Sequence, residues 1–334
     1  MKIVAKVGNE DIAMVYIAEL NSGNGKDPKG PGKKLIEFVE SVQPPTPRSE
    51  KWVLIVSTLF GCPVGCSFCD AGMYYDGKLT KDEILSQIDF LIHNRFPRGG
   101  VPVKKFKIQF ARMGEPALNE NVLDVLEELP DIYDAPGLMP SISTIAPIGT
   151  DSFFERLLDI KERIYGSQFQ LQFSIHTTDV EKRKSIIPVK IWDFEKIAGF
   201  GEKFYNADNR DNERKITLNF ALAEDTTIDP DIMMEHFSPE KFIIKVTPVN
   251  PTCSAKQNHI SSHIVPGVEK YEILEALKNK GYDVILSIGE LAENDIGSNC
   301  GQHIMNYMQK NEIVPGGYTY PLINIDEVVP IKDA

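Results

Sequence analysis

The sequence is poor in cysteine, lacks long apolar runs and has no excess of positive charge. Its 334 residues include five cysteines, an odd number at uneven spacing, which does not fit a framework of disulfides. The longest uncharged stretch of interest, residues 52–69, contains two glycines, a proline and three of the cysteines, so it is a poor membrane span. The N-terminal residues lack the apolar core of a signal peptide. These absences predict a cytoplasmic protein with no membrane segment.

Acidic residues outnumber basic ones, 48 against 36, which gives a net charge of −12. A protein that grips nucleic acid over a broad face neutralises phosphates with lysine and arginine, so this balance disfavours such a protein, although a local basic strip remains compatible with it. Hydrophobic residues make up 42% of the chain, which is ample for a core. The length fits one large domain or two ordinary ones.

Strand-like apolar runs alternate with helical patterns through most of the chain after residue 50. This rhythm predicts βαβ units and a parallel sheet, either open or closed into a barrel. One helix start is well marked, because Thr80 followed by Glu83 forms a capping box. The expected strands are Val53–Ser57, Lys105–Ala111, Met139–Thr144, Gln168–Ser174, Lys215–Leu222, Lys241–Pro248 and Asp283–Ser287, and the expected helices are Lys81–Asn94, Asn119–Leu129, Asp151–Ile160, Ile191–Lys203 and Gly267–Gly281.

Residues 1–50 show a different pattern, in which a loop rich in glycine and proline over Asn21–Lys33 separates short strand-like runs. We therefore expect three parts: a β-strand extension over 1–50, the main barrel over 51–310, and a C-terminal tail over 311–334 that packs on the barrel and contains a loose final strand. The expected strands of the extension are Ile3–Val7, Ile12–Leu20 and Lys34–Ser41.

Three cysteines are clustered directly after the first barrel strand, as Cys62-Pro-Val-Gly-Cys66-Ser-Phe-Cys69. Three thiolates this close in a loop can hold three irons of a [4Fe–4S] cluster and leave the fourth iron open to chelate the amino and carboxylate groups of S-adenosylmethionine (SAM). An aromatic residue between the last two cysteines, here Phe68, is usual in radical-SAM enzymes, which the motif resembles. Zinc is the competing interpretation, with Cys253 or a distant histidine as a fourth ligand.

The second barrel strand ends in a turn, Arg112-Met113-Gly114-Glu115-Pro116. Gly114 allows a close approach of the backbone, and the Glu115 carboxylate can receive the ammonium group of SAM. The alternative is that this segment is an ordinary turn. The segment lies at a strand end and follows the cysteine loop in the chain, and this position favours a role in binding SAM.

Further motifs resemble a narrower group, the RlmN/Cfr-type methyl synthases, which methylate an adenine of ribosomal RNA. The matching segments are MGEPALN at Met113–Asn119, SISTIAP at Ser141–Pro147, FSIHTTDVEKRKSIIPV at Phe173–Val189, TPVNP at Thr247–Pro251 and CGQ from Cys300. The resemblance implies that the SAM site is lined by Gly114, Glu115, Ser143, Ser174, Ile175, His176 and Asn250.

The resemblance also implies catalytic residues. Cys300 corresponds to the cysteine that carries a methyl group before transfer, and Glu40, in IEFVESV, corresponds to an acid/base glutamate. The family's second catalytic cysteine is replaced by Ile55, so Cys253 is the candidate for its role. Lys245 replaces an asparagine that contacts SAM. The 50 residues before the barrel leave no room for the family's N-terminal RNA-binding domain.

These observations predict a partial (β/α)6 barrel with a small N-terminal β extension, with the cluster and SAM at the C-terminal ends of the strands. Its predicted activity is reductive cleavage of SAM to a 5′-deoxyadenosyl radical, with electrons from a donor such as flavodoxin or ferredoxin. By resemblance to the methyl synthases, we expect one SAM to methylate Cys300 and a radical from a second SAM to activate that methyl group for addition to an sp² carbon of an unknown substrate. RNA is disfavoured as the substrate by the charge and the missing domain.

Two other functions remain open. One is hydrogen abstraction from a small molecule or peptide, in which Cys300 donates or accepts a hydrogen atom without methyl transfer. The other is a noncatalytic RNA-binding relative or a zinc-stabilised module. Iron and sulfide content separates a cluster from zinc, and SAM turnover separates an enzyme from a binding protein.

Overall fold

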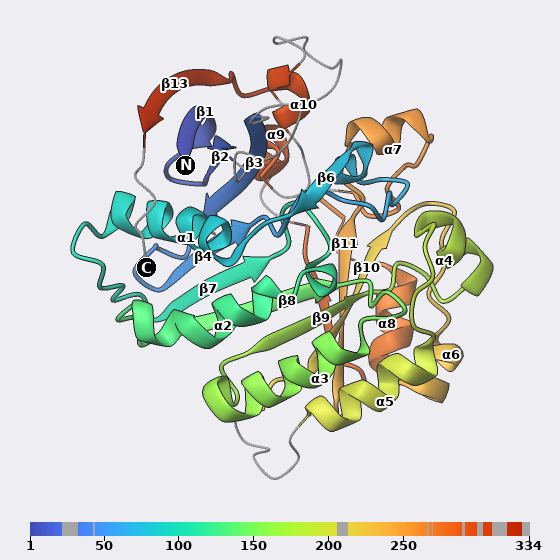
Figure 1. The fold of residues 1–334 in the computed structure, drawn as a ribbon. Helices are drawn as coiled ribbons and strands as arrows, with labels where there is room; N and C mark the ends of the chain where they lie inside the picture. The colour runs from blue at the N-terminus through green and yellow to red at the C-terminus, as the bar shows by residue number, and fades with distance from the viewer. Residues whose placement is uncertain are drawn as a thin grey trace.

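One twisted sheet connects most of the molecule, and in the described part of the chain it has eleven strands in the order β12-β11-β10-β9-β8-β7-β4-β3-β2-β1-β13. A two-stranded hairpin, β5 (Leu59–Gly61) with β6 (Tyr75–Lys78), forms a second sheet. The structure is a computed structural model, and Figure 1 shows its ribbon. It describes residues 1–21, 33–42, 44–205, 213–265, 267–268, 270–288, 291–298, 303–308 and 319–328.

Seven strands of the large sheet, in the order β4-β7-β8-β9-β10-β11-β12, run parallel to one another, as expected for successive βαβ units. This confirms the predicted α/β fold with a parallel sheet of the barrel type, although the short β12 adds a strand to the six of a (β/α)6 unit. The seven strands are β4 (Lys51–Val56), β7 (Lys105–Phe110), β8 (Leu138–Thr144), β9 (Gln170–Ser174), β10 (Ile216–Leu222), β11 (Phe242–Pro248) and β12 (Val284–Leu286).

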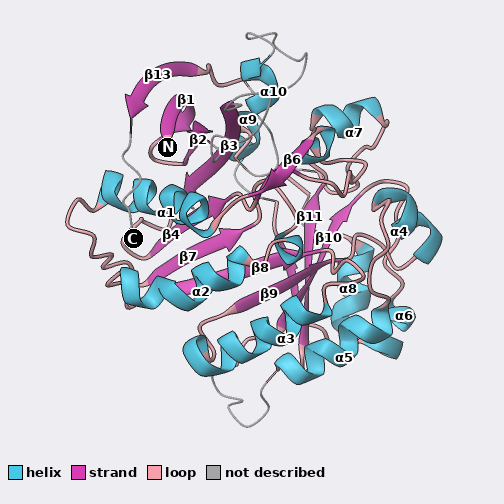
Figure 2. Cartoon of the chain, in the orientation of Figure 1, coloured by secondary structure: helices cyan, strands magenta, loops and turns pink. Residues whose placement is uncertain are grey.

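Helices cover one face of this parallel sheet, which we call the outer face (Figure 2). Side chains alternate along each strand, so that Phe106, Ile108 and Phe110 of β7 are buried against the helices while Lys107 and Gln109 point to the opposite, inner face. The covering helices are α1 (Lys81–Arg95), α2 (Asn121–Ile132), α3 (Asp151–Ile160), α5 (Phe194–Phe204), α6 (Pro230–His236) and α8 (Glu272–Asn279).

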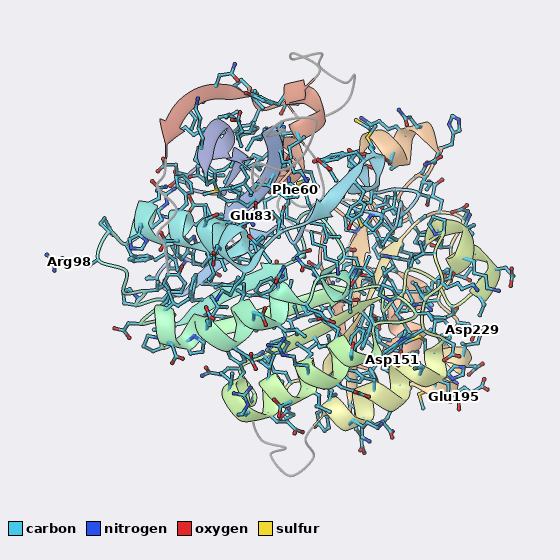
Figure 3. All side chains as sticks on the ribbon, viewed as in Figure 1. Phe60, Glu83, Arg98, Asp151, Glu195 and Asp229 are labelled. Carbon is cyan, nitrogen blue, oxygen red and sulfur yellow. The ribbon has the colours of Figure 1, made fainter. Side chains whose placement is uncertain are left out.

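Acidic residues begin several of these helices, where the partial positive charge of the helix N-terminus favours them. Figure 3 labels Glu83, Asp151, Glu195 and Asp229, which lie at the starts of α1, α3, α5 and α6. The predicted capping box of α1 is confirmed, because the Thr80 side chain accepts from the Glu83 amide and the Glu83 carboxylate accepts from the Thr80 amide. No helix within the described ranges is both long and apolar enough to cross a bilayer.

The N-terminal extension continues the same sheet in antiparallel fashion. Strand β3 (Lys33–Ser41) pairs with β4, and β2 (Ala13–Asn21) and β1 (Lys2–Asn9) follow it outward. The C-terminal strand β13 (Ile323–Val328) pairs with β1, at the edge of the extension farthest from the barrel strands.

The sequence patterns did not predict several short elements at the C-terminal edge of the parallel strands. They include the β5–β6 hairpin and several helices of three to seven residues, which are too short for a helical periodicity to show. These helices are η1 (Asp70–Met73), η2 (Pro116–Leu118), α4 (Val180–Ile186), α7 (Cys253–Gln257), α9 (Leu291–Ile296) and α10 (His303–Met308).

Candidate cofactor site

The three clustered cysteines lie in the loop between β5 and η1; none of them forms a disulfide, and all three are partly exposed. The loop closes on itself, because the Cys62 amide donates to the Tyr74 carbonyl at 3.0 Å and the Cys69 amide donates to the Cys66 carbonyl at 3.0 Å. Glycine makes this closure sterically accessible: a Cβ on Gly72 would lie 2.5 Å from the Cα of Gly65.

The thiols of this loop lie close enough to affect one another. Burial raises the pKa of Cys62 to about 11, and backbone hydrogen bonds, including one from Glu115, oppose that rise. Burial also raises the pKa of Cys66 well above its usual value, and the neighbouring thiols of Cys69 and Cys62 raise it further. Sulfur donors that repel one another as thiolates are stabilised by a bound cation, as in metal–thiolate sites.

This donor set fits a [4Fe–4S] cluster. Sulfur is the ligand that such clusters take, and each thiolate binds a different iron, so the three sulfur atoms need not converge on one point. Within the described residues, no three His, Cys, Asp or Glu side chains are placed to share a single metal ion.

The cysteine loop contacts the segments that follow two other strands, β9 and β11. The Ser67 amide donates to the Ile186 carbonyl of α4 at 2.9 Å, and the Thr252 hydroxyl, beyond β11, donates to the Phe68 carbonyl at 2.7 Å. The Phe68 ring meets the His176 ring edge to face, with centroids 4.9 Å apart. The residue between the last two cysteines therefore touches the segment after β9, where the family resemblance places the SAM site.

His176 adopts a left-handed backbone conformation, with φ of +68°, immediately after β9. Its Nδ1 accepts from the Ala221 amide at 3.2 Å, which assigns the ring proton to Nε2. Burial, and then the positive charge of Arg183, lower the pKa of His176 to about 3, so the imidazole is neutral at ordinary pH.

Gly114 and Glu115 form the turn after β7. Gly114 has φ of +99°, and a Cβ there would lie 2.5 Å from Leu59 Cγ, so the position requires glycine. The Glu115 carboxylate accepts from the Thr144 hydroxyl at 2.5 Å, the Ile145 amide at 2.9 Å and the Ala117 amide at 3.0 Å. Burial raises its pKa to about 7. The carboxylate thus joins the ends of β7 and β8 beside the cysteine loop.

The remaining predicted SAM-lining residues lie at neighbouring strand ends. The Ser143 hydroxyl accepts from the Gln172 amide group at 3.3 Å on the inner face. Ser174 is opposite Asn219 in register, and the Asn219 carbonyl accepts from the Ile175 amide at 2.8 Å. Asn250 follows β11, and its carbonyl accepts from the Thr252 amide at 2.8 Å.

Cys253 lies next to the cysteine loop, at the first position of α7. Its backbone amide donates to the Asp70 carboxylate at 3.1 Å, and Asp70 directly follows Cys69. Burial, and then the charge of Asp70, raise the pKa of the Cys253 thiol. The structure therefore brings Cys253 and the three clustered cysteines to the same end of the barrel.

Glu40 is not brought to this group. It lies on the outer face of β3, where its carboxylate accepts from Arg95 at 2.7 Å, from the Tyr16 hydroxyl at 3.1 Å and from the Trp52 indole at 3.2 Å. Arg95 belongs to α1, so Glu40 joins the extension to the helix layer. Ile55, at the position of the family's second cysteine, packs on the inner face against Val39 and Ile296.

The sequence reasoning missed three charged residues of the inner face. Lys107 is partly buried within the barrel, where burial and then the neighbouring Lys245 and Lys105 ammoniums lower its pKa well below the usual value. Glu37 and Arg112 form an ion pair whose side chains are 0% and 2% exposed. Strand alternation is the signal that identifies Lys107 and Glu37, since each shares the parity of inner-face neighbours, whereas Arg112 lies beyond the end of β7 and no such signal marks it.

Cys300 lies outside the described residues, together with residues 299–302 as a whole. The described residues on either side of it are Ser298 and His303. The Ser298 amide donates to the Glu293 carbonyl at 3.1 Å, and the His303 Nε2 lies 2.6 Å from the Ile296 carbonyl.

Comparisons with known proteins agree with this arrangement. No protein-family model matches the chain. A protein of Chlorobium phaeobacteroides named "Probable dual-specificity RNA methyltransferase RlmN" is 26% identical over 283 residues, which cover 84% of this chain and 74% of that protein. A protein of Thermosipho melanesiensis with the same name is 28% identical over 246 residues, which cover 71% and 68%.

A solved structure shares the fold. It is a radical SAM methyltransferase from Sphaerobacter thermophilus, which superimposes with a TM-score of 0.61 at 20% identity and covers 90% of this chain and 80% of that one. Together these matches confirm the resemblance inferred from the motifs and the predicted radical-SAM fold.

Proposed function

We propose that this chain, a radical-SAM enzyme related to the RlmN-type methyltransferases, binds a [4Fe–4S] cluster through Cys62, Cys66 and Cys69 and transfers a methyl group through Cys300. The observation that carries the proposal is that two motifs, the cysteine loop and the Gly114–Glu115 turn, lie close together in the structure. The cysteine loop and the Gly114–Glu115 turn lie at the same end of the sheet, where the Met113 carbonyl, just before the turn, accepts from the amides of Thr58 at 2.8 Å and Leu59 at 3.2 Å, just before the loop.

When bound, the cluster supplies an electron that cleaves SAM and produces a 5′-deoxyadenosyl radical. The protein supplies binding and orientation. Glu115 and the Gly114 backbone receive the methionyl end of SAM, and Ser143, Ser174, Ile175, His176 and Asn250 line the rest of the site.

His176 suits this place because it is neutral and buried. A neutral imidazole beside Phe68 adds no positive charge that would compete with the SAM sulfonium, and its Nε2–H remains available as a donor. The cysteine loop and the histidine pack against each other through the Phe68 ring.

Cys300 acts as the nucleophile toward the methyl group of SAM. Its thiolate sulfur forms a bond to the methyl carbon, the sulfonium carbon–sulfur bond breaks, and S-adenosylhomocysteine leaves. The thiol proton is released to solvent. The radical from a second SAM takes a hydrogen atom from this methyl group to become 5′-deoxyadenosine, and the resulting carbon radical bonds to an sp² carbon of the substrate as its π bond opens. The unpaired electron left on the adduct passes to a one-electron carrier, and the attacked carbon loses its proton to solvent.

In the release step, a second thiolate bonds to the Cys300 sulfur to form a disulfide, the bond from that sulfur to the substrate-bound carbon breaks, and the product takes up a proton. Two electrons from the one-electron donor then reduce the disulfide. Among the described residues, Cys253 is the cysteine outside the motif, and it lies next to the cluster loop. Cys253→Ala should therefore trap a covalent adduct between Cys300 and the substrate where the parent protein turns over. We propose no role in proton transfer for Glu40, because its oxygen atoms are already engaged by Arg95, Tyr16 and Trp52.

The names of the relatives suggest RNA as a substrate class to test first. The net charge of −12 disfavours an extensive phosphate-binding face, so a single exposed base in a short RNA is the form of RNA that fits best. A one-electron donor such as flavodoxin or ferredoxin completes the system.

Anaerobic reconstitution tests the cofactor. Wild-type protein should bind about four irons and produce 5′-deoxyadenosine from SAM with a chemical reductant, whereas Cys66→Ala should do neither. Cys253→Ala is the matched control, since it also removes a partly exposed thiol at this end of the barrel but should keep both properties. Zinc in place of iron with activity intact, or equal SAM cleavage by Cys66→Ala, contradicts the proposal.

A further inference from the structure

The family resemblance gives no role to the ion pair between Glu37 of β3 and Arg112 at the end of β7, although Glu37 lies in the IEFVESV segment. Both side chains are buried on the inner face of the sheet. Arg112 directly precedes Met113-Gly114-Glu115, so the pair sits at the base of the predicted SAM-binding turn. The Ser57 hydroxyl strengthens this connection, since it accepts from the Met113 amide at 3.2 Å and donates to the Glu37 carbonyl.

Each partner of this pair also holds a segment distant in sequence. Arg112 Nη1 donates to the Ser298 carbonyl at 2.7 Å, and Arg112 Nη2 donates to the Gly297 carbonyl at 2.9 Å. The Glu37 carboxylate accepts from the Ile304 amide at 3.1 Å. One ion pair therefore binds the described segments on both sides of residues 299–302, which contain Cys300.

The chemistry of the two side chains suits this task. A guanidinium presents five donors in a rigid plane, so Arg112 can hold two carbonyls and a carboxylate at once. A carboxylate with two oxygen atoms can accept from Arg112 and from the Ile304 amide separately. Buried charges satisfied in this way are fixed in place, because loss of any partner leaves a charged group unpaired.

We infer that Glu37 and Arg112 are positioning residues that fix the chain on both sides of Cys300 relative to the Gly114–Glu115 turn. The inference rests on the proposed function for the role of Cys300. Transfer of a methyl group between two sulfur atoms needs the reacting atoms about 3–3.5 Å apart and aligned, so a small displacement of the nucleophile costs much of the rate.

Hydrogen exchange on the full-length protein, measured by mass spectrometry, tests the inference directly. In Glu37→Gln/Arg112→Met both charges are removed together, so no unpaired buried charge remains. Peptides over residues 293–308 should then exchange about tenfold faster or more, while peptides from the other elements exchange as in the wild type. Glu40→Gln is the matched control, because it alters the other buried glutamate of β3 and should leave these peptides unchanged.

A second variant covers the case in which the double variant does not fold. Arg112→Lys keeps a positive charge beside Glu37 but lacks the planar fork that reaches two carbonyls. Exchange should then rise in the peptide over 293–298, while the Ile304 amide, held by Glu37, stays protected.

The rate of methyl incorporation at Cys300 is the functional readout. It should fall in the double variant with the affinity for SAM unchanged, because Gly114 and Glu115 are intact. Unchanged exchange over 293–308 in both variants overturns the inference. If exchange responds as expected but wild-type Cys300 never gains a methyl group, the positioning role stands and the proposed function fails.

Discussion

Glu37 and Glu40 are both buried on strand β3 and both paired with an arginine, but they serve opposite faces of the sheet. Glu40 points to the outer face, where Arg95 of α1, Tyr16 and Trp52 surround it. Glu37 points to the inner face, where its contacts are with Arg112 and the Ile304 amide. Two glutamates three positions apart thus have different roles because side chains alternate along a strand.

The same division holds for the whole sheet. On the outer face of β7, Phe106, Ile108 and Phe110 form the core with the helices, whereas the inner face presents lysine and glutamine. Substitutions on the outer face should therefore reduce the free energy of unfolding, and substitutions around the inner face should reduce cofactor binding or methyl transfer.

Glu40→Ala should give the largest loss of stability. Removal of this carboxylate leaves Arg95, Tyr16 and Trp52 without their buried acceptor, so the free energy of unfolding should fall by about 3 kcal/mol or more. Urea denaturation measures it. Glu10→Ala is the control, since Glu10 is an exposed partner of the same Arg95 and its loss should cost at most about 0.5 kcal/mol. If both variants lost the same free energy of unfolding, the buried partner of Arg95 would contribute no more to stability than the exposed one, which would contradict this prediction.

Acid should destabilise the site end of the barrel through His176. Its folded pKa of about 3 lies below the usual 6.5, so both states are neutral above pH 6.5, and the unfolded state alone binds a proton between 6.5 and about 3. The free energy of unfolding should therefore fall as the pH is lowered through this window, and at pH 5 it should be about 2 kcal/mol below its value at neutral pH.

His176→Asn is the matched variant for this measurement. Asparagine tolerates the positive φ of this position and its carbonyl oxygen can accept from the Ala221 amide, but it has no titrating group. Denaturation curves at pH 7 and pH 5 should show a smaller loss in the variant than in the wild type. Parallel losses would assign the acid sensitivity to other groups.

Gly114→Ala should weaken SAM binding about tenfold or more with the iron content unchanged, because the new Cβ collides with Leu59 and displaces the turn. Gly149→Ala is the control. Gly149 also has a positive φ, of +91°, but a Cβ there meets no atom within 4 Å. Isothermal titration measures the affinity of each variant for SAM. Equal affinities of Gly114→Ala and Gly149→Ala would contradict a specific role for Gly114 in the SAM site.

Thr80→Ala should produce the smallest effect, a loss of about 1 kcal/mol in the free energy of unfolding, because one hydrogen bond of the capping box at α1 is removed. SAM binding and iron content should not change, since α1 covers the outer face. Thermal unfolding together with iron analysis measures both properties, and loss of iron in this variant would contradict the separation of the two faces.

Much of the fold could be predicted from the sequence, because apolar periodicity reports directly on strands and helices. Helix α3 (Asp151–Ile160) begins and ends at the expected residues, and the capping box fixed the start of α1. The short helices α4 and α7 were missed because fewer than two turns show no period. They are held instead by tertiary contacts, such as the capping of α7 by Asp70.

The candidate site was predictable where local motifs carry it and not where distant segments meet. The loop of Cys62, Cys66 and Cys69 is contiguous, so its composition and spacing reveal it. Glu40 was selected by motif resemblance, although it shares the parity of Ile36 and Phe38, whose apolar side chains place that face against the helices. The link from Arg112 to Gly297 and Ser298 joins residues 185 and 186 positions apart, and no local pattern records it.

Peptide mass analysis of Cys300 tests the central claim most directly. After anaerobic reconstitution and incubation with SAM, the peptide that contains Cys300 should be heavier by one methyl group, and the corresponding peptide of Cys300→Ala should be unmodified. The absence of a cysteine at position 55 should not prevent this step, because the second thiol acts only after the substrate is attached. An unmodified Cys300 in protein that steadily produces 5′-deoxyadenosine would contradict methyl transfer and leave hydrogen abstraction as the activity.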